Sequence, residues 1–214
     1  MKKILLIVVL MFIYSCSLYK QREQNNNNND DNLSEIEKTI VNDFLEEELK
    51  KERYKSYKDF KIVLIEEALK TIKSIDTYLY SLDEWNTMNK INKSEDVINM
   101  YFLDTIQTNT IKSKILNEEI YQWKESDFNN IKMSLLKYNL FREKINSKKT
   151  MFEKEGFVIF LSKPLIIDNN NALISFDFLN CNYLCNGINH STILMRKVNN
   201  KWVENGYYED GVFN

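Results

Sequence analysis

Apolar residues recur with a helical period through the first half of the chain, from Leu33 to about Ile145. Ser34 and Glu37 have the spacing of a capping box, in which each side chain bonds the backbone N–H of the other residue at the start of a helix. The apolar residues that follow fall on one face, so the pattern predicts a helix over about 34–52. The residues of that face are Ile36, Ile40, Val41, Phe44 and Leu45.

Three further stretches of this half predict helices, each behind a polar residue that can cap a helix start. Asp59 precedes the first stretch, Ser94 the second and Ser126 the third. We therefore expect residues 33–150 to form a helical region. The apolar positions are Val63, Leu64, Ala68, Ile72 and Ile75 in the first stretch, Val97, Ile98, Tyr101, Phe102 and Ile106 in the second, and Phe128, Ile131, Leu135 and Phe141 in the third.

After Ser147 the pattern changes to short apolar runs, some with the two-residue period of β-strands. Asn199 and Asn200 stand between two of these runs, and asparagine tolerates the positive φ of a tight hairpin turn. Residues 151–214 are therefore predicted to form a small antiparallel β-meander. Packed with the helical region as one globular unit, it would give an α+β fold. The predicted strands are 157–161, 172–178, 191–198 and 201–208, with a turn over 168–171.

The amino terminus has the parts of a secretory signal peptide. Lys2 and Lys3 precede an uninterrupted apolar run from Ile4 to Ile13, and a small residue stands directly before Cys16. The run is far shorter than the ~20 residues of a membrane-spanning helix. Residues 1–15 are therefore predicted to be removed from the mature protein.

The residues IYSC, from Ile13 to Cys16, resemble the lipoprotein box of bacterial precursors, although Ile13 and Tyr14 depart from the residues that the box prefers. The resemblance implies that Cys16 is lipidated, with acyl chains such as palmitate, and becomes the new amino terminus. Stable attachment to a membrane takes more than one acyl chain, and lipoprotein processing supplies two or three. The membrane is thus the first expected partner.

Residues 16–32 form a polar stretch of low complexity, with five consecutive asparagines from Asn25 to Asn29. Such a stretch buries too little apolar surface to offset the entropy lost on ordering, so it is predicted to be a flexible tether. Ser17 follows Cys16 where many proteobacterial lipoproteins of the inner membrane carry an aspartate. We therefore expect the outer membrane, on its periplasmic or surface face.

Composition and charge narrow the class of protein further. With 43% apolar and 13% aromatic residues the body can build a core, and only 4 Gly and 1 Pro argue against a glycine-rich barrel or solenoid. The 29 basic and 31 acidic residues give a formal net charge of −2. Nucleic-acid binding requires a basic footprint that this composition lacks, so a nucleic-acid partner is not expected.

The stretch CNYLCNGINH, from Cys181 to His190, holds two of the three cysteines and the single histidine of the chain. A disulfide between Cys181 and Cys185 is the leading interpretation, because an exported protein lies where disulfides persist. A zinc site with His190 would have three ligands without the usual spacing. A nucleophilic pair of Cys185 and His190 would need an orienting partner and an oxyanion hole. Free or differently paired thiols are the remaining alternative.

Other candidate residues favour structural roles. Trp85, Trp123 and Trp202 could line a glycan or peptide groove, but core packing is the simpler interpretation. The acidic residues Glu46 to Glu48, with Lys50 and Lys51, are interpreted as a solvated helix face rather than a metal cluster. Glu209 and Asp210 have no further carboxylate tied to them by spacing. The sequence therefore predicts no catalytic residue, no metal ligand and no cofactor.

Two segments of the predicted sheet resemble uncharacterised lipoproteins of Bacteroidota. They are LSKPLIIDNNNALISF, residues 161–176, and ILMRKVNNKWVENG, residues 193–206. The resemblance implies a related fold and a similar cellular location, and it implies no activity.

These observations favour a membrane-anchored lipoprotein whose body is a non-catalytic binding or interaction module, with an unknown protein or glycan partner. The chain has no glycine-rich phosphate loop, no G-x-S-x-G and no H-E-x-x-H, motifs that many hydrolases and transferases carry. Two alternatives stay open: an extracytoplasmic enzyme that uses Cys185 and His190, and an immunity or inhibitor protein for a secreted toxin.

Overall fold

The computed structural model describes residues 32–52, 54, 62–88, 101–129, 131, 133–147, 156–181 and 185–209. The chain divides into two units, residues 1–32 and 33–214, and all helices and strands that the structure describes belong to the second. The expected signal peptide, the lipidation site Cys16 and the tether up to residue 31 lie outside the described residues, as do Asp59, Ser94 and Asp210. Among the described helices, none combines the length and the apolar composition needed to cross a bilayer.

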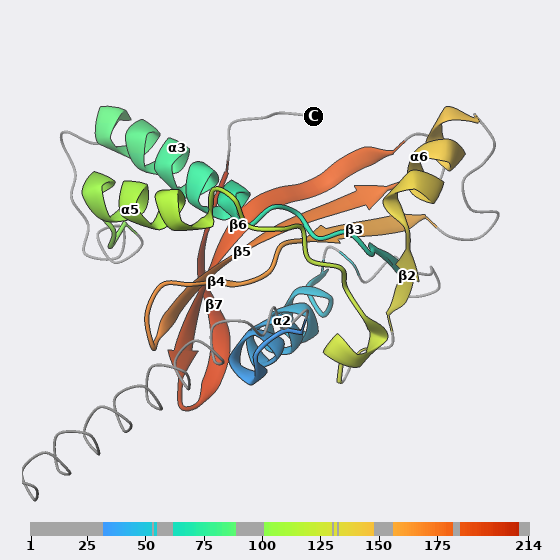
Figure 1. The fold of residues 1–214 in the computed structure, drawn as a ribbon, viewed down its shortest axis with the longest axis horizontal. Helices are drawn as coiled ribbons and strands as arrows, with labels where there is room; N and C mark the ends of the chain where they lie inside the picture. Colours follow the sequence, from blue (N-terminus) through green and yellow to red (C-terminus); the bar gives the residue numbers. More distant parts are fainter. Residues whose placement is uncertain are drawn as a thin grey trace, which may run out of the picture. The chain divides into compact units, whose positions relative to one another are not determined.

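A seven-stranded mixed sheet forms the centre of the second unit (Figure 1). The strands follow the order β2-β1-β3-β5-β6-β7, and β4 pairs with β5 beside this path. The prediction of an α+β fold is therefore confirmed. The strands are β1 (Ile62–Ile65), β2 (Ser134–Leu136), β3 (Phe157–Leu161), β4 (Leu165–Ile166), β5 (Asn171–Asn180), β6 (Asn186–Val198) and β7 (Lys201–Tyr208).

Helices cover both faces of this sheet. The first face carries α2 (Glu35–Glu48), whereas the second face carries α3 (Ile72–Met88), α5 (Thr105–Ile115) and α6 (Tyr138–Asn146) (Figure 1). A short 3-10 helix, η2 (Glu125–Asp127), precedes β2. The predicted capping box at the start of α2 is confirmed, since Ser34 and Glu37 bond each other's backbone N–H.

The carboxy-terminal meander follows the sequence pattern closely. The four alternate residues Ala172, Ile174, Phe176 and Phe178 of β5 are all fully buried in the core beneath α2. The turn between β6 and β7 consists of Asn199, with φ of 50°, and Asn200, with φ of 64°. These are the positive angles of a two-residue hairpin, which asparagine adopts at less strain than most residues.

Residues 33–150 hold the four described α-helices, but they also hold two strands that the expected helical region did not include. Val63 and Leu64 lie in β1, which pairs in parallel with β3 and β2, and Leu135 lies in β2. Leu64 contacts the core of the first face and Ile65 that of the second, so β1 is buried on both sides. A four-residue apolar run of this kind fits a buried strand or a piece of helix equally well, and the period cannot separate them.

The remaining predicted helices are displaced rather than absent. Tyr101 and Phe102 precede a helix instead of lying within one, since α5 begins at Thr105 behind a capping box of Asp104 and Gln107. The stretch behind Ser126 divides into strand β2 and helix α6. Helical spacing therefore joined elements that are separate in the structure. It also placed Ile106 on an apolar face, whereas this side chain is 78% exposed. Val97 and Ile98 lie outside the described residues.

The second face of the sheet has two apolar clusters with a gap between them. One cluster lies under α3 and α5 and includes Leu173 of β5 and Leu194 of β6. The other lies under α6 and includes Val158 of β3 and Cys181. Polar residues of β5 and β6 occupy the sheet between these clusters, and they form the candidate site.

Candidate functional site

Three neighbouring strands place a row of unlike residues across the second face. Phe160 of β3 lies opposite Asp177 of β5, and Asp177 lies opposite His190 of β6. Two positions along β5, Ser175 lies opposite Thr192. Since residues two apart on a strand share a face, the sequence puts both polar pairs on the side that carries α3 and α6.

The pair Ser175 and Thr192 belongs to a buried hydroxyl cluster. Ser175 Oγ lies 2.8 Å from Thr192 Oγ1 and 2.8 Å from Oγ of Ser74 in α3, and the Ser175 N–H donates to Ser162 Oγ at 2.8 Å. All four side chains are fully buried. Because every hydroxyl has a partner, we assign this cluster to the packing of α3 on the sheet rather than to ligand binding.

The pair Asp177 and His190 meets the charged end of a lysine. Lys73 Nζ donates to both carboxylate oxygens of Asp177, at 3.0 and 2.9 Å. His190 Nδ1 lies 2.5 Å from Asp177 Oδ1. A carboxylate only accepts hydrogen bonds, so Nδ1 carries the proton in this contact and is no acceptor for Lys73 Nζ, 3.3 Å away. The Asp177 carboxylate therefore accepts hydrogen bonds from both the Lys73 ammonium and the His190 imidazole and fixes their orientation.

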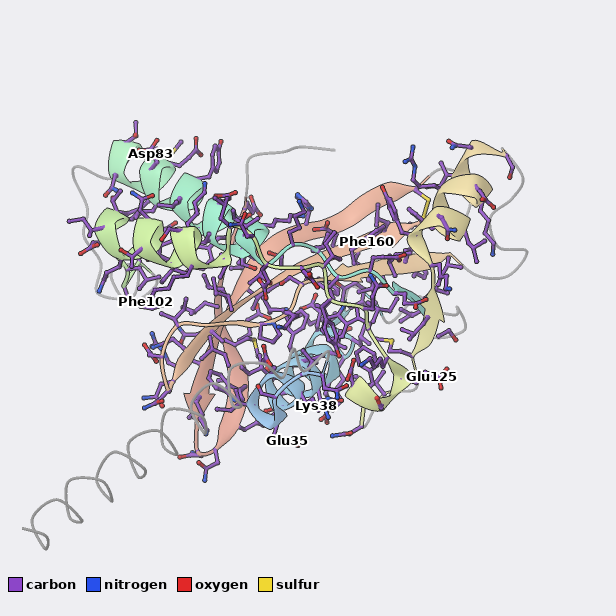
Figure 2. The ribbon with its side chains drawn as sticks, in the orientation of Figure 1. Glu35, Lys38, Asp83, Phe102, Glu125 and Phe160 are labelled. Carbon is purple, nitrogen blue, oxygen red and sulfur yellow. A yellow bond between two sulfur atoms is a disulfide. The ribbon has the colours of Figure 1, made fainter. Side chains whose placement is uncertain are left out.

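A cleft of about 420 Å³ opens beside this cluster, between α6 and the sheet. Its wall is aromatic: the Phe160 ring lies 5.3 Å from that of Phe141 and 6.3 Å from that of Tyr138, centroid to centroid. Figure 2 shows Phe160 on the side of the sheet that carries α6. Asp177 and His190 form the polar end. The described lining residues are Leu69, Tyr138, Phe141, Ile145, Phe160, Asp177, Leu179, Cys185, Gly187 and His190.

Helix α6 is held over the cleft at its start and along its length. The backbone N–H of Tyr138 donates to Glu67 Oε2 at 2.7 Å, which provides an acceptor at the helix N-terminus. Phe141 is buried against Val158 and Cys181. The remaining cleft residues of α6 are half exposed, with Tyr138 at 43% and Ile145 at 42%.

The structure joins the sulfur atoms of Cys181 and Cys185, whose Cα atoms lie 4.0 Å apart. This is the pairing that the sequence favours, and it closes the end of the β5–β6 hairpin just beyond the last strand pair, Asn180 with Asn186. Cys181 is buried, whereas Cys185 lines the cleft. The bond therefore ties one wall of the cleft to the sheet.

His190 contacts Asp177 and Lys73, a set that the sequence analysis did not foresee. Residues 172–178 have the pattern of a strand with one apolar face, and Asp177 lies on the other, polar face. Lys73 is one of many lysines and has no distinguishing spacing. Within the described part of the chain, no group of three or more His, Cys, Asp or Glu side chains is arranged to hold a metal ion.

The tryptophans do not line the cleft. Trp123 and Trp202 are each 1% exposed and lie in the core under α2. Trp85 stacks on Tyr101, with ring centroids 5.2 Å apart, beside the cluster under α3.

The acidic run of α2 is only partly a solvated face. Glu48 is buried at 1% exposure, accepts a hydrogen bond from Tyr54 and pairs with Lys51. Burial lowers the pKa of Lys51, but hydrogen bonds from its ammonium to Glu204 and Glu48 outweigh that effect, so the pKa is raised overall. The expectation of a fully solvated run is therefore wrong at Glu48, whose carboxylate links the end of α2 to β7 through Lys51.

Fold and site together define an α+β protein with an aromatic cleft that ends at Asp177 and His190, both of which contact Lys73. Comparison of the chain with models of protein families, with curated proteins and with solved structures found no match. The likeness to Bacteroidota lipoproteins therefore stays a prediction from the sequence.

Proposed function

We propose that the protein is a lipid-anchored binding protein of the cell envelope, and that its cleft takes a small ligand with a largely apolar body. The observation that carries this proposal is the half-exposed apolar wall formed by Tyr138 and Ile145 next to the Asp177–His190 pair. Binding pockets for small molecules commonly measure ~300–1,000 Å³ and combine an apolar lining with a few convergent polar groups. The cleft has this size and this composition.

The cellular location in this proposal, at a membrane, is inferred from the sequence. Acyl chains on Cys16 hold the protein at a membrane, by preference the outer membrane, and residues 16–32 let the body stand away from it. A tethered body with an open cleft suits a protein that collects a ligand at the membrane surface. No step of this role requires a reaction at the site.

A neutral fluorescent probe, N-phenyl-1-naphthylamine, tests the apolar part of the cleft. The protein used is residues 16–214 with Cys16→Ser, which retains the whole second unit and needs no detergent. We expect saturable fluorescence enhancement. The double variant Tyr138→Ala, Ile145→Ser should weaken binding about tenfold, because it removes apolar surface that the bound probe would cover.

Leu140→Ser provides the matched control for this experiment. Leu140 lies on the same helix as Ile145 with nearly the same exposure, 43%, but does not line the cleft. Its substitution should leave the affinity unchanged. Equal weakening by the control and by the cleft variant, or no enhancement with the parent protein, would remove the proposal.

An enzyme that uses Cys185 and His190 is the second candidate, and one observation favours it: both residues line the same cleft. A sulfur in a disulfide is not a nucleophile, since thiolate is the reactive form. We expect the unreduced protein to have an intact mass two hydrogens below that of the reduced form and to resist iodoacetamide. Alkylation of Cys185 in the unreduced protein would instead support the enzyme.

A further inference from the structure

The charge at the polar end of the cleft is already paired within the protein. Lys73 Nζ lies 3.0 Å from Oδ1 and 2.9 Å from Oδ2 of Asp177, and His190 Nδ1 donates to the same Oδ1. One ammonium therefore matches one carboxylate, and with a neutral imidazole the three groups sum to zero. The two side chains are only 25% and 16% exposed, so solvent screens the pair less than it would an ion pair on the open surface.

A charged head group would find no partner at this end that the protein does not already use. Asp177 is the carboxylate among the described residues that line the cleft, whereas Lys73 does not belong to that lining. A cationic head group would compete with Lys73 for the carboxylate. An anionic head group would meet the carboxylate itself. Either group would lose hydration in the cleft without a new partner, which is unfavourable for a charge.

The other end of the cleft consists of three aromatic rings in two orientations. The rings of Tyr138 and Phe141, both from α6, lie 6.2 Å apart, centroid to centroid, and are inclined by only 30°. The ring of Phe160, from β3, stands at 76° to each of them. Aromatic rings attract each other both in offset stacks and edge to face. A flat aromatic ligand can therefore stack on one orientation while it meets the other edge-on.

We infer that the cleft binds an uncharged aromatic compound, with its rings against Tyr138, Phe141 and Phe160, and that the pairing of Asp177 with Lys73 excludes ligands of either charge. Lys73 acts as a positioning residue: it cancels the charge of Asp177 from outside the lining. This inference rests on the proposed function and specifies the chemical class of its ligand.

Four two-ring compounds test the inference by isothermal titration calorimetry: 2-naphthol, its saturated counterpart decahydro-2-naphthol, 2-naphthoate and 2-naphthylmethylammonium. The protein is again residues 16–214 with Cys16→Ser, at about pH 8, above the ordinary imidazole pKa of ~6.5. We expect 2-naphthol to bind at least tenfold more tightly than either charged compound. It should also bind about threefold or more tightly than decahydro-2-naphthol, because the saturated rings lose the aromatic contacts.

Two variants test whether charge pairing causes this selectivity. Asp177→Asn leaves the Lys73 ammonium unmatched, so the ratio of the affinity for 2-naphthoate to that for 2-naphthylmethylammonium should rise about tenfold. Lys73→Gln leaves the Asp177 carboxylate unmatched, so the same ratio should fall about tenfold. Lys70→Gln is the matched control, because it removes the same charge from an exposed position three residues away. It should leave the ratio within twofold.

Binding of either charged compound to the parent protein as tightly as 2-naphthol would overturn the inference, and so would equal affinities for 2-naphthol and decahydro-2-naphthol. These two results need no variant, so they decide even if Asp177→Asn or Lys73→Gln does not fold. Shifts of the ratio in the same direction in both variants, or a shift in Lys70→Gln as large as in Lys73→Gln, would also overturn it.

Failure of all four compounds while N-phenyl-1-naphthylamine binds would likewise overturn the inference. In each of these cases the proposed binding function stands as long as the fluorescent probe binds and the variant Tyr138→Ala, Ile145→Ser weakens it. Failure of the fluorescent probe together with all four compounds would remove both.

Discussion

Lys73, Asp177 and His190 come from three different elements, α3, β5 and β6, and their side chains meet on the second face of the sheet. They meet because the pairing of β5 with β6 sets Asp177 opposite His190, before the register shift at Phe178 and Leu179, and because α3 begins above this pair. His190 could be chosen in advance as the single histidine, but its partner could not. An aspartate on the polar side of a strand normally indicates a solvated face, whereas here α3 and α6 flank that face.

Three tyrosines, Tyr78, Tyr121 and Tyr208, make the stability of the protein depend on pH. The Tyr78 side chain is fully buried, and its hydroxyl accepts from the Leu103 N–H at 2.9 Å and donates to the Leu103 carbonyl at 3.2 Å. Burial raises the pKa of Tyr78 to about 12. Burial likewise raises the pKa of Tyr121 and of Tyr208 well above the ordinary value. All three side chains are therefore held in the neutral form.

The stability of the protein should fall as the pH rises above about 10. The folded state keeps tyrosine protons that the unfolded chain releases near its ordinary pKa of ~10, so unfolding is favoured increasingly from there up to the folded values. Urea unfolding at several pH values between 9 and 11.5 measures this slope. Tyr78→Phe should make the slope shallower, whereas Tyr207→Phe, at a position 57% exposed, should not. An unchanged slope in Tyr78→Phe would contradict the argument.

At the scale of elements, sequence pattern predicted the carboxy-terminal strands well and the amino-terminal ones poorly. The runs at 157–161, 172–178, 191–198 and 201–208 all lie within β3, β5, β6 and β7. These strands are joined locally by turns whose residues mark them. In contrast, β1 and β2 are short, and their partners lie far along the chain. No local signal distinguishes such strands from apolar turns of a helix.

The edge strand β7 is closed by side chains of α2. An exposed edge offers unpaired N–H groups to other chains. The outward N–H of Trp202 donates to Asp43 Oδ2 at 2.8 Å, and that of Glu204 donates to Glu47 Oε2 at 3.4 Å. Since Asp43 and Glu47 are one helical turn apart, the same face of α2 serves both groups. The acidic residues of α2 thus act in place of a further strand.

Asp43→Ala should lower the free energy of unfolding by about 1–2 kcal/mol, because the Trp202 N–H loses its acceptor. Hydrogen exchange at the Trp202 amide should become faster at the same time. Glu46→Ala is the control on the same helix, since Glu46 pairs with Lys50 at the surface and contacts no strand in the described hydrogen bonds. A change at Glu46 as large as that at Asp43 would assign the effect to α2 itself.

At the scale of the whole molecule, the central prediction is that lipid on Cys16 anchors the protein to a membrane. Radiolabelled palmitate should enter the full-length chain, and Cys16→Ala should release the protein from the membrane fraction. The reason is that the predicted cleavage removes the apolar run from Ile4 to Ile13 with residues 1–15, so that the acyl chains on Cys16 are the expected anchor of the mature protein. Recovery of an unlabelled chain from the cytosol with residues 1–15 still attached would contradict the predicted address.

The paired strands of the sheet differ in how far apart they lie along the sequence. The hairpins β5–β6 and β6–β7 close over short turns, whereas β1 must find β3 across the interval from residue 63 to residue 158. Closing so long a loop loses more chain entropy and slows folding. Folding should therefore nucleate at the carboxy-terminal hairpins, with β1 docking last, and until then the edge of β3 that β1 covers would be open to chaperones and proteases.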